Sequence, residues 1–341
     1  MAYEVTIGIP VYNVEKYIRL TMDSALAQTF ESIEFLICDD CGTDSSIDIV
    51  KEYQRNHPRG KDIRIVHQPH NMGIGAARNR MIAEAQGRYF FSLDADDVIR
   101  KDTINLLYEN AKKYKAEIVY GSREHVFIYG DKKRIVQYPY PFCVFTKPDE
   151  YAEYVYNVGI QVQNWNFLID LNILRRNHLQ VTPVGHGYGE DYTFTVDLPT
   201  YITRAVLLPD ITYQYMIEEN KSQNKQRKLL SRRQMDSAIE AIDKKKRRIE
   251  LKGKSYYAKR CSILMMYDFY FACQVVARRK EANPPYTNKE IQAIMYHPMT
   301  LSEILGSKQA RMINLITYAL GVLPSPVSVT LLQVARRFKH Q

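Results

Sequence analysis

The sequence predicts an α/β fold, in which a mostly parallel sheet flanked by helices is followed by a helical C-terminal region. Two observations carry this prediction. Over the first 121 residues, short apolar segments of strand length alternate with segments whose apolar residues recur at helical spacing, a pattern typical of parallel strands joined by right-handed crossovers. From Asn220 the chain becomes basic and then carries helical patterns to its end.

The strands and helices of the first part follow from the spacing of its apolar residues. Strands are predicted at Glu4–Val11, Ile33–Cys38, Ile63–His67, Tyr89–Leu93 and Ala116–Gly121. Helices are predicted at Glu15–Gln28, Asp44–Tyr53 (with Thr43 or Asp44 as its cap), Gly75–Gln86 and Thr103–Tyr114. This part accounts for most of the predicted sheet.

The pattern changes after residue 122. His125–Tyr138 is typical of an irregular strand or a hairpin. Helices are expected at Asp149–Val158, Ile169–His178 and Asp191–Leu198, and strands at Ala205–Leu208 and Thr212–Met216. With 341 residues and roughly 150 residues per domain, we expect two units, 1–218 and 219–341.

Polar residues follow three of the predicted strands. In parallel sheets, ligands bind beyond the carboxyl ends of the strands, so these residues should gather at one crevice. They are Tyr12 and Asn13 after the first strand, Asp39 and Asp40 after the second, and Asp94, Asp96 and Asp97 after the fourth.

The acidic turn Asp94-Ala95-Asp96-Asp97 has two readings. Three carboxylates in four residues repel one another, and a divalent cation relieves that repulsion. Hard oxygen ligands suit Mg²⁺ or Mn²⁺, which proteins usually hold with one or two carboxylates plus substrate phosphates. The alternative is a solvated acidic turn that caps the helix after it.

Five segments together resemble family 2 glycosyltransferases with the GT-A fold, in the same order and spacing. The resemblance covers about residues 4–217 and departs from the family at Cys41, where a small residue or serine is usual. The segments are Ile9-Pro10-Val11-Tyr12-Asn13, Cys38-Asp39-Asp40-Cys41-Gly42-Thr43-Asp44, Asn71 to Asn79 (N-x-G-x-x-x-A-R-N), Asp94-Ala95-Asp96 and Tyr188 to Phe194 around Glu190-Asp191.

The resemblance implies an inverting, metal-dependent transferase with its nucleotide-sugar site in 1–121 and its acceptor side in 122–218. It implies Asp96 as the metal ligand and Asp191 as the catalytic base, with Glu190 as the second candidate. The implied donor-binding residues are Pro10, Tyr12, Asn13, Asp39, Asp40, Asn71, Gly73, Arg78, Asp94 (ribose or donor sugar) and Ala95. The implied acceptor-side residues are Trp165, His186 and Tyr188.

The residue chemistry agrees with several of these roles. Asp39 or Asp40 can accept the N3–H of a uracil, so a UDP-sugar is the expected donor. Arg78 is a permanent cation near a predicted helix N-terminus and suits a diphosphate, although a surface salt bridge is its alternative. Asp191 can act as general base or cap its helix. Trp165 can stack on a sugar or lie in the core.

Other classes of protein fit less well. The segment Gly73-Ile74-Gly75 is a weak dinucleotide-binding signal, because Arg78 occupies the third glycine position and the segment follows the third strand. A nucleotidyltransferase needs an N-terminal glycine-rich, basic phosphate loop, which this sequence lacks. A non-catalytic nucleotide-sugar or glycan-binding module on the same fold is the main alternative, and the intact Asp94, Asp96 and Asp191 argue against it.

The positive charge is concentrated in one segment. Residues 220–260 hold 15 Lys/Arg and 4 Asp/Glu, a net charge of +11, whereas the whole chain carries +9. This segment suits phosphates of an anionic lipid or a lipid-linked acceptor, or it is a solvated helix face. The apolar residues of Pro326–Phe338, followed by basic ones, suit an interfacial helix or a helix packed on the catalytic domain.

Cellular placement follows from what the sequence contains. The five scattered cysteines favour reduced thiols, and we find neither a secretory signal nor an apolar stretch of ~20 residues. We therefore expect a cytoplasmic protein, peripheral on the inner face of the membrane. Its expected acceptor is a glycan or lipid-linked glycan in bacterial-type surface polysaccharide or glycoconjugate synthesis, and we expect no nucleic-acid partner.

Overall fold

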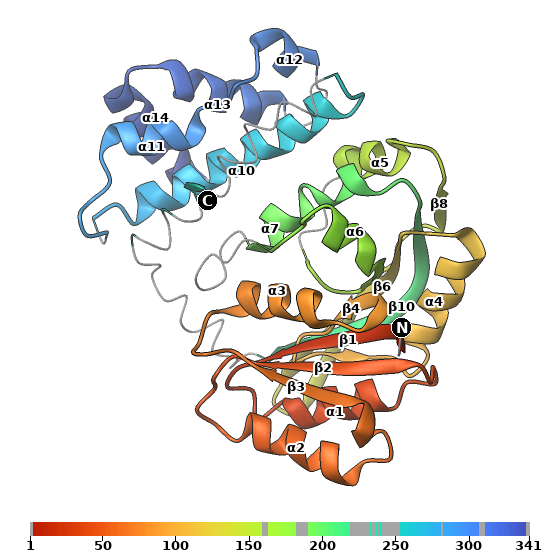
Figure 1. Ribbon diagram of the computed structural model, residues 1–341. Helices are drawn as coiled ribbons and strands as arrows, with labels where there is room; N and C mark the ends of the chain where they lie inside the picture. The colour runs from red at the N-terminus through yellow and green to blue at the C-terminus, as the bar shows by residue number, and fades with distance from the viewer. Residues whose placement is uncertain are drawn as a thin grey trace. The chain divides into compact units, whose positions relative to one another are not determined.

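The computed structural model describes residues 3–158, 163–181, 190–218, 232, 236, 239–240, 253–280, 282–306 and 311–338 (Figure 1). The chain divides into two compact units. The first comprises residues 1–151 and 162–227, and the second comprises 152–161 and 228–341. Compared with the predicted boundary at residue 218, the first unit extends nine residues further, and a short internal segment belongs to the second.

The first unit is built on a mixed ten-stranded sheet with the order β3-β2-β1-β4-β9-β6-β10-β5, to which β7 adds at β6 and β8 at β10. β1 pairs in parallel with β2 and β4, β2 with β3, and β6 with β10, whereas β9 runs antiparallel between β4 and β6. The strands are β1 Tyr3–Val11, β2 Ile33–Asp39, β3 Ile63–His67, β4 Gly87–Ser92, β5 Val98–Ile99, β6 Ile118–Tyr129, β7 Lys132–Tyr138, β8 Cys143–Phe145, β9 Phe167–Asp170 and β10 Ala205–Glu218.

Helices cover both faces of the parallel part of this sheet. Figure 1 shows α1 and α2 on one face of β1–β3 and α3 on the other. The helices of this unit are α1 Ile18–Leu26, α2 Ser46–Asn56, α3 Ile74–Glu84, α4 Thr103–Tyr114, α6 Leu171–Arg176 and α7 Glu190–Thr195, with 3-10 turns at Gly60–Asp62 and Leu198–Tyr201. The α/β class and the flanking helices predicted from the sequence are confirmed.

The second unit is helical in its described part. Helix α5 (Glu150–Val158) begins in the first unit and continues into this one. The later helices are α10 Tyr257–Ala277, α11 Asn288–Met295, α12 Leu301–Gly306, α13 Arg311–Val322 and α14 Ser325–Phe338. Within the described ranges, none of the helices combines the length and the apolar character needed to cross a bilayer.

Three of the expected elements are corrected by the structure. The helix predicted at Ile169–His178 is wrong in its first two residues, because strand β9 continues to Asp170, whose carboxylate accepts from the Asn172 N–H and starts α6. The two strands predicted around residues 205–216 are one strand, β10, with register shifts at Leu207/Ile211 and Ile211/Tyr213. The exposed Pro209 and Asp210 interrupt the apolar pattern there without ending the strand.

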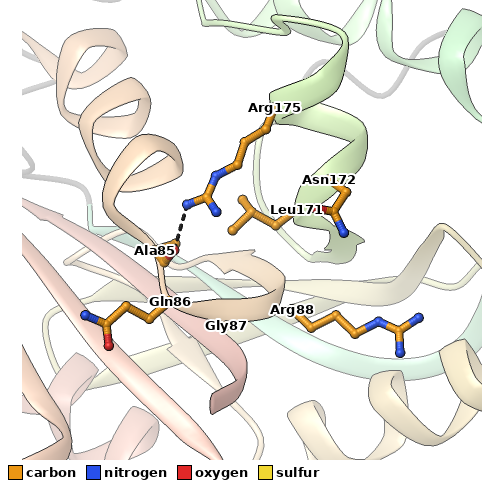
Figure 2. Close-up of a pocket in the computed structure, with 7 residues that line it drawn as sticks. All are labelled: Ala85, Gln86, Gly87, Arg88, Leu171, Asn172 and Arg175. Carbon is orange, nitrogen blue, oxygen red and sulfur yellow. Dashed lines mark hydrogen bonds between the residues drawn. The ribbon is translucent and has the colours of Figure 1, made fainter. Parts of the chain in front are cut away.

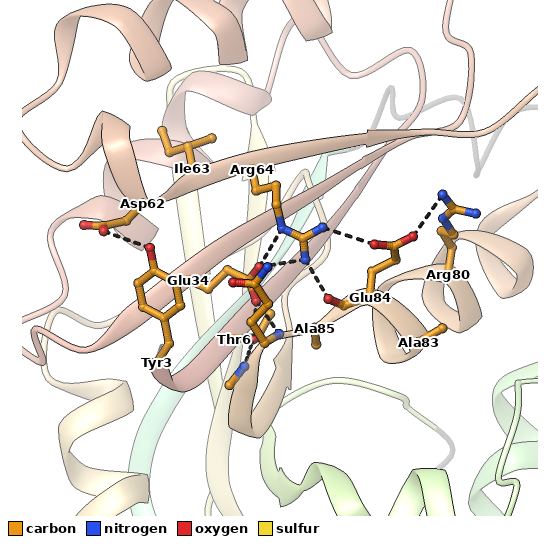
Figure 3. A network of polar contacts seen from close by, with 12 residues as sticks. Tyr3, Thr6, Glu34, Asp62, Ile63, Arg64, Arg80, Ala83, Glu84 and Ala85 are labelled. Atoms are coloured by element: carbon orange, nitrogen blue, oxygen red, sulfur yellow. Dashed lines mark hydrogen bonds and ion pairs between the residues drawn. The ribbon is translucent and has the colours of Figure 1, made fainter. Parts of the chain in front are cut away.

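The amino-terminal edge of the parallel strands is held by a buried carboxylate (Figure 3). The Glu34 side chain is 2% exposed and forms an ion pair with Arg64 at 2.7 Å. It also accepts hydrogen bonds from the Thr6 hydroxyl at 2.6 Å and the Gln86 N–H at 2.8 Å. Arg64 in turn contacts Glu84 at 3.2 Å. This network ties β1, β2 and β3 to the segment between α3 and β4.

Candidate active site

The carboxyl ends of β1, β2 and β4 lie at one edge of the sheet, as the parallel pairing requires. Val11 at the end of β1 stands in register with Asp39 at the end of β2. Beyond β1, Tyr12 is 44% exposed, and Asn13 adopts a left-handed backbone with φ of 51°. The Asn13 side-chain oxygen accepts from the Thr43 N–H at 2.7 Å. The end of β1 is thereby joined to the loop after β2.

Asp39 and Asp40 have different surroundings. Asp40 is 3% exposed, and its two oxygens accept from the backbone N–H groups of Met72 at 2.8 Å and Gly73 at 2.9 Å. It therefore shapes the loop that holds Asn71 and Gly73 before α3. The Asp39 carboxylate accepts from the Cys41 N–H at 3.0 Å and lies 2.8 Å from Nδ1 of His67.

Of the two aspartates, Asp39 is the better placed to meet a ligand. Its side chain is 15% exposed and its partner His67 is 57% exposed. His67, at the end of β3, was not among the residues singled out from the sequence. Its position beyond the carboxyl end of a parallel strand is the signal that could have identified it. Pro10, by contrast, is buried in β1, so only its backbone can face a ligand.

The acidic turn separates into an inward and an outward part. Asp97 is 0% exposed, and its carboxylate accepts from the Tyr213 hydroxyl at 2.9 Å and the Met216 N–H at 2.9 Å. The same hydroxyl accepts from the Asp94 N–H at 3.2 Å. The expectation that Asp97 faces the crevice is wrong, because its carboxylate fastens the turn to β10. Asp94 and Asp96 remain partly exposed.

The outward pair fits a cation that arrives with a diphosphate. Mg²⁺ is typically bound through one or two carboxylates together with substrate phosphates rather than by a full protein cage, and oxygen ligands also suit Mn²⁺. Among the described residues, no group of three or more His, Cys, Asp or Glu side chains is placed to hold a metal ion. Ala95 between the two aspartates is 4% exposed, so packing fixes the turn that presents them.

One guanidinium joins the predicted donor side to the predicted base. The Arg78 side chain, from α3, is only 4% exposed, which excludes a surface salt bridge. Its Nη2 donates to Asp94 Oδ1 at 2.9 Å, and its Nη1 donates to Asp191 Oδ1 at 2.7 Å. Asn164, which is 3% exposed, donates to the same Asp191 oxygen at 2.8 Å. Asn164 was also missed by sequence reasoning, because no motif marks it.

The surroundings of the Asp191 carboxyl shift its pKa upward. Desolvation by the surrounding protein raises its pKa, Arg78 opposes this rise, and the charge of Asp94 adds to it. A carboxylate with a raised pKa accepts a proton more readily. Asp191 lies in the first turn of α7, and its side chain is oriented by Arg78 and Asn164.

The predicted acceptor side is described only in part. Trp165 is 4% exposed and stacks on Tyr213, with ring centroids 4.3 Å apart and planes 13° apart. This burial favours the core alternative for Trp165, beneath the acidic turn. His186, Tyr188 and the side chain of Glu190 lie outside the described residues.

A pocket of about 310 Å³ lies elsewhere on the first unit (Figure 2). It is lined by residues from the start of β4 and from α6, at the opposite end of β4 from the acidic turn. Arg175 borders it, but its guanidinium donates to the carbonyl oxygens of Ile82, Ala83 and Ala85 and so ends α3. None of the site residues predicted from the sequence lines this pocket.

Sequence comparisons point to one family. Residues 6–164 match the model of "Glycosyl transferase family 2". A glycosyltransferase, GlyA, from Streptococcus pneumoniae is 37% identical over 120 residues, which is 35% of this chain and 16% of that protein. A chondroitin synthase from Escherichia coli is 40% identical over 109 residues, 32% of this chain and 15% of that protein. The chain thus spans a small share of these two relatives.

Comparison with solved structures agrees on the fold. The crystal structure of S. aureus TarS 1-349 in complex with UDP has a TM-score of 0.58 at 17% identity, over 93% of this chain and 90% of that chain. The structure of GalNAc-T7 with UDP, GalNAc and Mn²⁺ has a TM-score of 0.55 at 11% identity, over 81% of this chain and 51% of that chain. Residues 6–164 therefore match glycosyl transferase family 2, and the chain that carries them has the GT-A fold.

Proposed function

We propose that this protein is an inverting, metal-dependent glycosyltransferase that uses a UDP-sugar, with Asp191 as its general base. The observation that carries the proposal is the Arg78 bridge between Asp94 and Asp191. It places a partly exposed carboxylate of raised pKa beside the acidic turn at the strand ends. A transferase needs this pairing of a donor side and an acceptor base within a few ångströms.

The donor side is formed by the ends of β1, β2 and β4. The exposed ring of Tyr12 offers a stacking face for a base, and Asp39 offers an acceptor for the uracil N3–H. Two solved structures of the same fold contain UDP or UDP-GlcNAc, which supports a uridine donor here. Asp94 is our candidate for the ribose or donor-sugar hydroxyls, and Asp96 for the metal.

The reaction is a single displacement. The Asp191 carboxylate takes the proton of an acceptor hydroxyl as its oxygen bonds to the anomeric carbon. The bond from that carbon to the diphosphate breaks, and the nucleotide leaves with the electron pair, so the configuration inverts. Asp96 would hold Mn²⁺ or Mg²⁺, and such an ion would supply positive charge for the leaving diphosphate. Arg78 and Asn164 hold the base in its ionised form and fix its direction.

The acceptor class follows from the relatives and from charge. A chondroitin synthase and a poly(ribitol-phosphate) beta-glucosyltransferase are among the similar proteins. The basic segment 220–260, with its net charge of +11, suits a phosphate-bearing glycan or lipid-linked acceptor. We therefore propose a role in bacterial surface polysaccharide synthesis, at the inner face of the membrane.

The base assignment is tested by transfer and hydrolysis assays on a panel of UDP-sugars with Mn²⁺. Asp191→Asn should lower kcat by about 10²–10⁴-fold, the range that general-base catalysis contributes, with UDP binding retained. Glu190→Gln is the matched control, because it removes the neighbouring carboxylate. Equal turnover of wild type and Asp191→Asn would refute the base assignment. No turnover by the wild type on any donor would favour the non-catalytic binding module.

The donor and the metal are tested together by thermal shift. We expect UDP with Mn²⁺ to raise the melting temperature more than UDP alone, and Asp96→Ala to remove the contribution of Mn²⁺. A shift with another nucleoside diphosphate and none with UDP would contradict the uridine assignment. An equal shift with and without Mn²⁺ would contradict the metal.

A further inference from the structure

The last two helices form an uncharged stretch between basic ends. Helix α13 and helix α14, here called the C-terminal hairpin (residues 311–338), are joined by a short turn after Val322. From Met312 to Ala335 the sequence runs for 24 residues without Asp, Glu, Lys or Arg. Helices at the surface of a protein in water normally carry charged residues on their exposed face, and this stretch offers none.

Three polar side chains of the hairpin are fully buried. Asn314, Thr317 and Ser328 are each 0% exposed. Asn314 donates to the hydroxyl of Ser262 on α10, and Ser328 donates to the carbonyl of Leu320 at 2.7 Å. These hydrogen bonds tie α13 to α10 and close the turn between α13 and α14. The buried side also contains Leu332, which is 0% exposed.

Six apolar side chains of the hairpin are exposed. On α14 the exposed residues recur at helical spacing, at positions 327, 331 and 334, and on α13 at 312 and 316. Their exposed fractions are Met312 71%, Ile316 40%, Val322 62%, Val327 46%, Leu331 45% and Val334 46%. The hairpin therefore exposes these apolar side chains within a stretch of sequence that contains no charged residue. Such a face is stable where its surroundings are themselves apolar.

The charged residues at the ends of the hairpin indicate what kind of apolar surroundings would cover its exposed face. After Glu303 the sequence contains no Asp or Glu, and it contains five basic residues: Lys308, Arg311, Arg336, Arg337 and Lys339. All five precede or follow the uncharged stretch. A second copy of this chain would bring like charges together around such a face, whereas an anionic bilayer neutralises them.

We propose that the outward face of the C-terminal hairpin inserts into the interface of an anionic lipid bilayer. The helices have 12 and 14 residues, well short of the ~20 needed to span the hydrocarbon core, so the hairpin lies in the plane of the membrane surface. An apolar face combined with flanking basic residues is the arrangement that gives interfacial binding. The proposal does not depend on the glycosyltransferase activity. It identifies an apolar surface for membrane binding in addition to the basic segment 220–260.

The test is co-sedimentation of the full chain with large unilamellar vesicles. Vesicles of phosphatidylcholine with 30% phosphatidylglycerol, chosen as about a third anionic lipid, should bind the wild type, and pure phosphatidylcholine should bind it more weakly. Leu331→Glu should reduce binding to the anionic vesicles more than about tenfold, because it places a charge in the buried face. The neutral Leu331→Ser should also reduce it, which separates loss of apolar contact from change of charge.

The matched control is Gln333→Glu. It introduces the same charge on the same helix, at an exposed position beside the apolar face, and should retain most of the binding. Because the substituted side chains are exposed, all variants should remain folded, and circular dichroism checks this. Equal binding by wild type, Leu331→Glu and Leu331→Ser would overturn the proposal. The proposal would also be overturned if the wild type were a dimer in ultracentrifugation, Leu331→Glu were a monomer, and neither protein bound vesicles.

Discussion

The pair Asp191 and Asn164 shows how single residues set the acid–base chemistry of this site. Asp191 has a pKa raised by desolvation, and Asn164 donates a hydrogen bond to its carboxylate. A hydrogen bond to the charged form favours that form and lowers the pKa. Burial therefore raises the pKa of the proposed base and Arg78 opposes the rise, and we expect the hydrogen bond from Asn164 to oppose it as well.

A pH profile tests the role of Asn164. Because Asp191 must be ionised to accept a proton, kcat/KM should fall as the pH drops through a pKa above the ordinary value of 3.8. Asn164→Ala should move this acid limb to higher pH, with activity recovering at alkaline pH. Asn172→Ala, the same change at an exposed position on α6, should leave the limb unchanged. A uniform loss by Asn164→Ala at every pH would indicate structural damage instead.

The sequence could identify residues of this site but not their contacts. Arg78 and Asp191 were both named from their motifs, yet they are 113 positions apart, and their ion pair depends on how α3 and α7 pack. Asn164 lies in no recognisable motif. Asp97 was read as a third outward carboxylate because spacing alone cannot tell which side of a turn a side chain takes. His67 ends the predicted strand Ile63–His67, but its contact with Asp39 is visible only in the structure.

At the level of elements, local patterns were informative where one strand or helix follows from its own residues. Helix α4 (Thr103–Tyr114) and strand β3 (Ile63–His67) have the predicted bounds. Strand β9 was missed because four residues are too few for a periodic signal, and its place between β4 and β6 depends on distant partners. Strand β10 was divided in two because its irregular register hides the alternation.

The buried Glu34 should contribute more to stability than Glu84, the other acidic partner of Arg64. Glu34→Gln leaves Arg64 without its buried partner and should lower the free energy of unfolding by about 3 kcal/mol, as for other broken buried pairs. Glu84→Gln removes the ion pairs of the Glu84 carboxylate with Arg64 and Arg80, but Glu84 is 35% exposed, so the loss should stay below about 1 kcal/mol. Chemical denaturation of the two variants measures the difference. Similar losses for both would contradict a dominant role for Glu34.

The whole molecule consists of two units that each bury their own core. The first core surrounds β1, β2 and β4, and a core in the second includes Cys261, Met265, Met299 and Ile304. Units with separate cores can unfold separately. The residues of the proposed donor site belong to the first unit and the C-terminal hairpin to the second, so ligand binding and core substitutions should act on different unfolding transitions.

Calorimetry tests this division. UDP with Mn²⁺ at about 100 times the dissociation constant should stabilise the first unit by about 2.7 kcal/mol and raise one transition only. Leu264→Ala, at a fully buried position on α10, should cost about 2–5 kcal/mol and lower the other. A single transition that moves in both experiments would show instead that the units unfold together.

The contact of the buried Asp97 carboxylate with Tyr213 links the acidic turn to a residue that is distant in the sequence. The D-x-D pattern occurs often by chance. A chance occurrence would not be expected to be followed by an aspartate that is hydrogen-bonded to a buried tyrosine. Here the Tyr213 hydroxyl binds Asp97 across 116 positions of sequence and also meets the backbone of Asp94. A database search that requires D-x-D-D together with a tyrosine in the last strand would therefore discard many accidental matches. The contact seen in the structure therefore makes the motif more specific than its four residues alone.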